Sequence, residues 1–170
     1  MTNDRRDGRE SILPSDWRPD RFATLIYLIR EDEVLLIEKL RGHGAGKVNA
    51  PGGHIEVGET PEECAIREAF EEVGITVLSA ELRASLKFHD TENGFNMLGY
   101  ALVSKTFSGE PRSTPEADPF WSKIDQIPFE RMWEDDQHWV PRILAGETLD
   151  CEFVFANDVL QTLNIERILN

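Results

Sequence analysis

Residues 53–75 read GHIEVGETPEECAIREAFEEVGI and carry the clearest helix signals of the chain. Within it, Thr60 is a suitable helix N-cap, Pro61 suits the first helical position, and Gly74 supplies a stop. Glu63 stands where it would complete a capping box with Thr60. We therefore expect a helix that begins at Pro61 and ends before Gly74.

The expected helix carries an acidic face. Glu68, Glu71 and Glu72 stand at positions i, i+3 and i+4, so a helix would project them from one side. Three such carboxylates are suited to holding hard divalent cations such as Mg²⁺, although a solvated acidic face is the simpler alternative. The opposite face, which we expect to pack on a core, carries Ile66, Phe70 and Val73.

The residues around the acidic face favour a ligand site over a plain acidic surface. Gly52 and Gly53 allow the backbone to approach a ligand closely, and Gly58 permits a tight turn. Glu59 stands where it is able to pair with Arg67 on the helix.

This stretch resembles the Nudix box, in which a glycine is followed after five residues by glutamate and after seven more by Arg-Glu. Ala69 is smaller than the usual aliphatic residue at its position, which is a mild departure. The residues that fall on the fixed positions of the box are Gly53, Glu59, Arg67, Glu68, Glu71, Glu72, Gly74 and Ile75.

The resemblance implies a hydrolase that depends on Mg²⁺ or Mn²⁺ and cleaves a diphosphate linked to another moiety, with the box forming a loop-helix-loop. Attack of water on a polyphosphate needs cations that neutralise charge and acidify the water, and carboxylates hold such cations. By the resemblance, Glu68, Glu71 and Glu72 are both metal ligands and catalytic residues, and Glu72 is the candidate base.

The amino-acid composition indicates which kinds of binding partner the protein is able to have. The chain of 170 residues is acidic, with 32 Asp and Glu against 18 Lys and Arg and a formal net charge of −14, so we expect no groove for long nucleic acid. A small anionic substrate remains feasible if metals bring positive charge. Cys64 and Cys151 give no disulfide framework, and no apolar stretch resembles a signal peptide or a membrane span. We expect a cytoplasmic protein without a membrane partner, and the sequence does not indicate its oligomeric state.

The rest of the chain predicts one α/β domain. Residues 1–20 are polar and proline-interrupted, so we expect a flexible or loosely docked extension that Trp17 is able to pin, before a single domain over residues 21–170. Together with the resemblance, the pattern implies an α/β/α sandwich around a central mixed sheet. Strand-like runs are FATLIYLI and EVLLIEKL as a hairpin, then ITVLSAEL, RASLKFHD, FNMLGYALVSK, PFWSKI, CEFVFA and VLQTLNIERI, with a short helix in DDQHWVPRILAG.

A second informative stretch is FERMWEDDQHWVP at residues 129–141. Trp133 is able to cover the face of a nucleotide base, while Asp135 and Asp136 offer hydrogen bonds to a purine edge. If the two carboxyls are buried together, one is favoured to stay neutral, which gives the pair a donor and an acceptor. The alternative is that Asp135 caps the following helix and Asp136 is solvated.

From about Phe22 onwards, including RGHGAGKVN before the box, the chain is similar to the MutT-like oxidised-purine nucleoside triphosphatases of the animal type. That resemblance implies that Asn49 reads the base edge beside Trp133 and the aspartates. Taken alone, the other implied positions have ordinary explanations in strand packing, core filling or solvated charge. The resemblance places Thr24, Lys39, Gly53, Phe88 and Met97 beside the substrate, and Gly52 and Glu116 with the metal ligands.

The chain also departs from that group. Val48 replaces a tryptophan, His43 replaces an aromatic residue of the pocket, and Ala50-Pro51 replaces a glycine-aromatic pair. The base preference is therefore less determined than the reaction. We expect Mg²⁺-dependent hydrolysis of an oxidised purine nucleoside triphosphate, such as 8-oxo-dGTP, to the monophosphate and pyrophosphate. The alternatives are a Nudix hydrolase of a nucleotide sugar or an RNA 5′ end, and a non-catalytic nucleotide-binding module.

Overall fold

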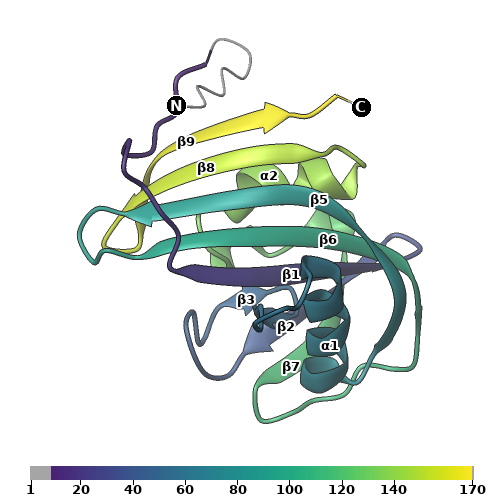
Figure 1. The fold of residues 1–170 in the computed structure, drawn as a ribbon. Helices are drawn as coiled ribbons and strands as arrows, with labels where there is room; N and C mark the ends of the chain where they lie inside the picture. Colours follow the sequence, from purple (N-terminus) through teal and green to yellow (C-terminus); the bar gives the residue numbers. More distant parts are fainter. Residues whose placement is uncertain (1–8, 170) are drawn as a thin grey trace.

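The computed structural model describes residues 9–169 (Figure 1). The prediction of a flexible extension therefore falls partly on residues 1–8, which lie outside the described part. In the segment that follows, the Trp17 indole Nε1 donates to the Phe88 carbonyl at 3.2 Å, and the Ile12 amide donates to the Glu152 carboxylate at 3.0 Å. Trp17 thus fastens residues 9–20 to the domain.

A mixed sheet forms the centre of the molecule, as predicted. Its strands run in the order β3-β2-β1-β6-β5-β8-β9, with β4 paired to β1 and β7 paired to β2. The pairs β1/β6 and β5/β8 are parallel, and the remaining pairs are antiparallel. The strand bounds are β1 Arg21–Arg30, β2 Glu33–Lys39, β3 Val48–Asn49, β4 Gly52–His54, β5 Thr76–Asp90, β6 Asn96–Ser108, β7 Ala117–Lys123, β8 Leu149–Ala156 and β9 Val159–Arg167.

The strand predictions need one correction. ITVLSAEL and RASLKFHD were expected as separate segments, but they belong to one strand, β5, of 15 residues. The register of β5 against β6 shifts at several points between Val77 and Ala84. A β-bulge inserts an extra residue into one strand while the hydrogen bonding to its neighbour continues, so β5 bends at these points without ending.

Two α-helices pack on the sheet, α1 (Pro61–Val73) and α2 (Asp136–Leu144). Helix α1 has its predicted bounds: the Thr60 hydroxyl accepts from the Glu63 amide at 3.2 Å, and the Glu63 carboxylate accepts from the Thr60 amide at 2.9 Å. Gly74 ends the helix at a φ of 76°, a left-handed conformation that glycine adopts without strain. Short 3₁₀ turns occur at Ile124–Gln126 and Phe129–Arg131. Within residues 9–169, no helix is long and apolar enough to cross a membrane.

The two helices lie on opposite faces of the sheet (Figure 1). Ile26 and Leu28 of β1 belong to the core cluster under α1, whereas Tyr27 between them belongs to the cluster that holds Trp139 of α2. This alternation is the period of two that a strand imposes on its side chains. The α/β/α layering predicted from the sequence is confirmed.

The buried face of α1 differs from the prediction. Phe70 is 55% exposed, so its assignment to the core face was wrong. The residues that face the sheet core are Ala65, Ala69 and Val73, whose small side chains let the helix lie close to the strands. The smaller residue at position 69 therefore belongs to the packing surface.

Candidate active site

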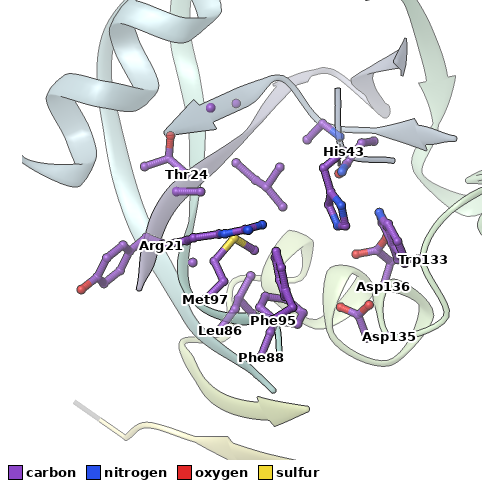
Figure 2. Close-up of a pocket in the computed structure, with 18 of the residues that line it drawn as sticks. Arg21, Thr24, His43, Leu86, Phe88, Phe95, Met97, Trp133, Asp135 and Asp136 are labelled. Carbon is purple, nitrogen blue, oxygen red and sulfur yellow. Dashed lines mark hydrogen bonds between the residues drawn. The ribbon is translucent and has the colours of Figure 1, made fainter. Parts of the chain in front are cut away.

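A cavity of about 210 Å³ opens beside β1, between the loop that follows β2 and the N-terminus of α2 (Figure 2). Its wall is formed by residues of several strands, by His43 from the loop after β2, and by the segment from Trp133 to Asp136. Glu72 from the box and Gly52 just before it also reach the cavity, so the acidic helix and the base pocket meet in one space. The predicted substrate residues that line it are Thr24, Lys39, Asn49, Gly53, Phe88, Met97, Trp133, Asp135 and Asp136.

The aspartate pair is buried. Asp135 is 2% exposed and Asp136 is 3% exposed, so Asp136 is not a solvated residue. The Asp135 side chain makes no capping bond in the described chain; its Oδ2 accepts a 2.8 Å hydrogen bond from the Trp139 indole. Asp135 thus stands at the N-cap position of α2 without capping it through its side chain, and neither ordinary explanation accounts for the pair.

The electrostatics of the pair follow from this burial. Burial raises the pKa of Asp135 to about 6, and burial together with the Asp135 charge raises the pKa of Asp136 well above its usual range. The Oδ2 atom of Asp136 and the Tyr27 hydroxyl are buried without a hydrogen-bond partner inside residues 9–169. A pair that shares one proton offers a ligand both a donor and an acceptor.

Other predicted pocket residues are held in different ways. The Asn49 Oδ1 accepts from the Ala50 amide at 2.9 Å, which orients the amide group. Phe88 stacks on Phe153 with ring centroids 5.2 Å apart. Thr24 is almost fully buried, and its hydroxyl lies 3.3 Å from the Cys64 thiol of α1, so this hydroxyl is already engaged on the helix side.

Arg67 organises the box, and its predicted pairing with Glu59 is confirmed. Its Nε and Nη2 atoms contact the two Glu59 oxygens at 2.7 and 2.9 Å. This bidentate hydrogen bond lowers the pKa of Glu59 to about 2. The Nη1 atom also reaches Glu68 at 2.8 Å and Glu71 at 3.2 Å. One guanidinium thus ties the loop before α1 to the acidic face.

Glu72 is the acidic residue that enters the cavity. It is 5% exposed and accepts a 2.9 Å hydrogen bond from the Gly52 amide. Burial raises its pKa to about 7 against the opposing effect of that hydrogen bond, and the charge of Glu68 adds to the rise. A carboxylate with such a pKa is suited to accept a proton near neutral pH.

The two glycines before α1 are required by close packing. A Cβ on Gly53 would lie 2.3 Å from the Glu68 carboxyl carbon, and a Cβ on Gly52 would lie 1.9 Å from the Thr24 carbonyl oxygen. Any side chain at either position would displace β4 or the Glu68 carboxylate.

Carboxylates suit a hard cation, and the charges of Glu68 and Glu116 both act on Glu72. Within residues 9–169, however, no three acidic, histidine or cysteine side chains converge on one point. Glu71 turns to Arg67, and Glu116 forms an ion pair with Arg41 at 3.2 Å and lies outside the cavity wall. A cation that used all the predicted ligands would have to draw these carboxylates away from their arginines.

Several cavity residues were missed by the sequence analysis, among them Arg21, His54, Phe95 and Asp158. Phe95 directly follows the Asn93-Gly94 turn, and a large apolar side chain next to a polar hairpin turn is a signal that it covers something. The other three carry no comparable local signal, because only the pairing of distant strands brings them to the cavity.

Residues 19–143 match the family model of the NUDIX domain, and the chain belongs to this family. It is similar to the zebrafish (Danio rerio) protein named oxidized purine nucleoside triphosphate hydrolase, with 39% identity over 149 residues that cover 87% of this chain and 96% of the relative. The mouse (Mus musculus) protein of the same name is 34% identical over 135 residues, covering 79% of this chain and 86% of that protein. Among solved structures, the MutT protein of Bacillus halodurans superposes with a TM-score of 0.75 at 26% identity, covering 86% of this chain and 97% of that one.

Proposed function

We propose that this protein hydrolyses oxidised purine nucleoside triphosphates, such as 8-oxo-dGTP, to the nucleoside monophosphate and pyrophosphate. The observation that carries the proposal is the buried Asp135–Asp136 pair, which lines the same cavity as Trp133 and Glu72. The names of the zebrafish and mouse relatives support this substrate class.

Base recognition rests on groups that combine donors and acceptors. Oxidation of guanine at C8 adds a carbonyl oxygen and turns N7 from an acceptor into a donor. The Asn49 amide and the single-proton aspartate pair supply both kinds of group in a cavity that is also lined by apolar side chains, where a mismatched polar group is costly. We assign the stacking contact to Trp133, and apolar contacts to Phe88 and Met97.

Glu72 is the proposed base for the attacking water. It reaches the cavity, is held by the Gly52 amide, and has a pKa of about 7. Lys39 lines the same part of the cavity and suits a phosphate oxygen. Bound Mg²⁺ or Mn²⁺ would neutralise phosphate charge and lower the pKa of water. The proposed ligands are the Gly52 carbonyl, Glu68, Glu71, Glu72 and Glu116.

A substrate panel tests the proposal directly. The full chain is assayed with MgCl₂ on 8-oxo-dGTP, dGTP, dATP, a nucleoside diphosphate sugar and a 5′-triphosphorylated RNA, with kcat/KM determined for each. We expect the highest kcat/KM on 8-oxo-dGTP, with pyrophosphate as the co-product and activity lost on chelation. Faster cleavage of the sugar nucleotide or the RNA would contradict the substrate class. Binding without hydrolysis of any nucleotide would favour a regulatory module.

We further propose that residues 21–170 act as one catalytic domain and that the protein works in the cytoplasm. Cys64 and Cys151 are both free and buried, which suits a reducing compartment.

A further inference from the structure

The face of Trp133 in the cavity is covered by another ring of the same chain. The His43 imidazole stacks on Trp133 with ring centroids 5.1 Å apart and an interplanar angle of 14°. It also stacks on Phe95, at 5.1 Å and 15°. Figure 2 shows the imidazole lying between the two larger rings. His43 therefore fills a flat slot whose walls are aromatic.

Cations surround this stack. The Arg21 guanidinium carbon lies 4.7 Å from the Phe95 centroid, and the Lys47 ammonium lies 4.8 Å from the Trp133 centroid. Burial and the nearby charge of Lys39 lower the pKa of His43, with Arg21 and His54 acting in the same direction and Asp158 opposing them. These effects favour the neutral imidazole, and the ring is held by stacking on Phe95 and Trp133.

Two glycines shape the loop that carries His43. Gly42 and Gly44 flank it with φ values of 84° and 80°, in a region that glycine enters without strain. A Cβ on Gly44 would lie 3.1 Å from the Trp133 Nε1 atom, so the loop backbone rests directly against the indole edge. Displacement of the imidazole from the indole therefore requires backbone rotation at Gly42 and Gly44, which glycine permits more readily than other residues.

We propose that His43 is a specificity-determining residue that competes with the nucleotide base for Trp133, so that the base binds by displacing the imidazole from between Phe95 and Trp133. The inference rests on the proposed function, because it takes Trp133 as the stacking residue for the base. A purine has a larger π surface than imidazole and gains hydrogen bonds from the aspartate pair. A base that stacks weakly or fails to bond the pair does not displace the ring.

Binding of the product 8-oxo-dGMP to the full chain tests the competition, because the product is not turned over. We compare the wild type with His43→Ala and His43→Phe by calorimetry and by stopped-flow tryptophan fluorescence. Removal of the competing ring in His43→Ala should lower Kd about two- to tenfold and raise the association rate, the range expected from loss of one aromatic stack. His43→Phe should bind no more tightly than the wild type, because its ring still occupies the slot.

The sign of the effect decides between two roles for His43. If the imidazole is a wall that packs on the bound base, His43→Ala will weaken binding, and the competition is overturned. His138→Ala is the matched control, since His138 is an exposed histidine of α2 that does not line the cavity. Its Kd should equal that of the wild type.

A second measurement follows the ring itself. The His43 ring protons, assigned by their absence in His43→Ala, should show ring-current shifts in the free protein and move toward the shifts of an exposed histidine when 8-oxo-dGMP is added. Binding with unshifted His43 resonances overturns the competition alone. Absence of any binding of 8-oxo-dGMP overturns this inference alone, whereas the proposed function falls if 8-oxo-dGTP is not hydrolysed.

Discussion

The indole Nε1–H of Trp139 donates a 2.8 Å hydrogen bond to Oδ2 of Asp135, and both residues are buried. Trp139 in turn meets Tyr27 of β1 edge to face, with ring centroids 5.9 Å apart. The orientation of Asp135 is therefore fixed from the core side of α2. Its geometry toward a ligand depends on the packing of α2 against the sheet and not on the loop that precedes it.

Asp135→Asn should lower the discrimination between oxidised and normal dGTP. The amide still offers an oxygen to Trp139, but it no longer shares a titrating proton with Asp136. We expect the ratio of kcat/KM for 8-oxo-dGTP over dGTP to fall by about tenfold, the loss that accompanies one mismatched buried hydrogen bond. Glu130→Gln, at an exposed position that does not line the cavity, is the control. An unchanged ratio in Asp135→Asn would mean that the pair is structural.

The same carboxyl should leave a signature in the pH dependence of stability. Its pKa rises to about 6 in the folded protein, so the folded state keeps a proton that the unfolded state loses. The protonated Asp135 carboxyl contributes about 3 kcal/mol to the free energy of unfolding below about pH 4. This contribution is lost as the pH rises through about 6. In urea unfolding between pH 4 and pH 7, Asp135→Asn should gain stability relative to the wild type as the pH rises. Parallel profiles for the two proteins would show that the carboxyl does not hold this proton.

Glu72→Gln should remove most turnover without unfolding the protein. Glutamine keeps an oxygen for the Gly52 amide but is unable to accept a proton, so kcat for 8-oxo-dGTP should fall by about 10²–10⁴. Circular dichroism and the thermal midpoint should match the wild type. Glu62→Gln, on the exposed first turn of the same helix, should keep full activity. Near-normal rates in Glu72→Gln would remove Glu72 from its proposed role.

Asp90→Asn should loosen the mouth of the cavity. The Asp90 carboxylate accepts hydrogen bonds of 2.9–3.1 Å from the loop after β5, at residues 92–93, and from the loop between β8 and β9, at residues 157–158. These hydrogen bonds hold its pKa at about 2 against the effect of burial. An amide group would place a donor against these donors. We expect a loss of about 2 kcal/mol in the free energy of unfolding at pH 7 and a higher KM for 8-oxo-dGTP. The donors are the amides of Glu92, Asn93, Asn157 and Asp158 and the Asn93 side chain.

The destabilisation caused by Asp90→Asn should depend on pH. Stability from a carboxyl with a lowered pKa is present at neutral pH and is lost as the pH falls through about 2, so the cost of Asp90→Asn should shrink in acid. Glu92→Gln changes only an exposed side chain on the same loop and should leave stability and KM unchanged. A stable Asp90→Asn with normal KM would show that the two loops hold their places without this carboxylate.

Local sequence signals predicted the elements well where the chain determines its own conformation. The bounds of α1 follow from Thr60, Glu63 and Gly74, whose capping groups act within a few residues of one another. The Glu59–Arg67 pair was predicted on the same basis, since one loop and two helical turns separate its members. The face of α1 was misjudged at Phe70, because a helical wheel shows the spacing of apolar residues but not the direction from which a sheet approaches.

The acidic helix, its capped ends, the mixed sheet and the Asp-Asp pair after Trp133 were all predictable from the order of residues along the chain. Three features became visible in the folded molecule: His43 stacks on both Phe95 and Trp133, the aspartate pair is buried near Tyr27, and Glu72 enters the cavity while Glu71 remains outside. The two sets of features differ in the distance along the chain between the residues that interact. Caps and turns are set by hydrogen bonds between near neighbours, whereas burial, pKa shifts and ring stacking depend on strands that are distant in sequence and are brought together by the sheet.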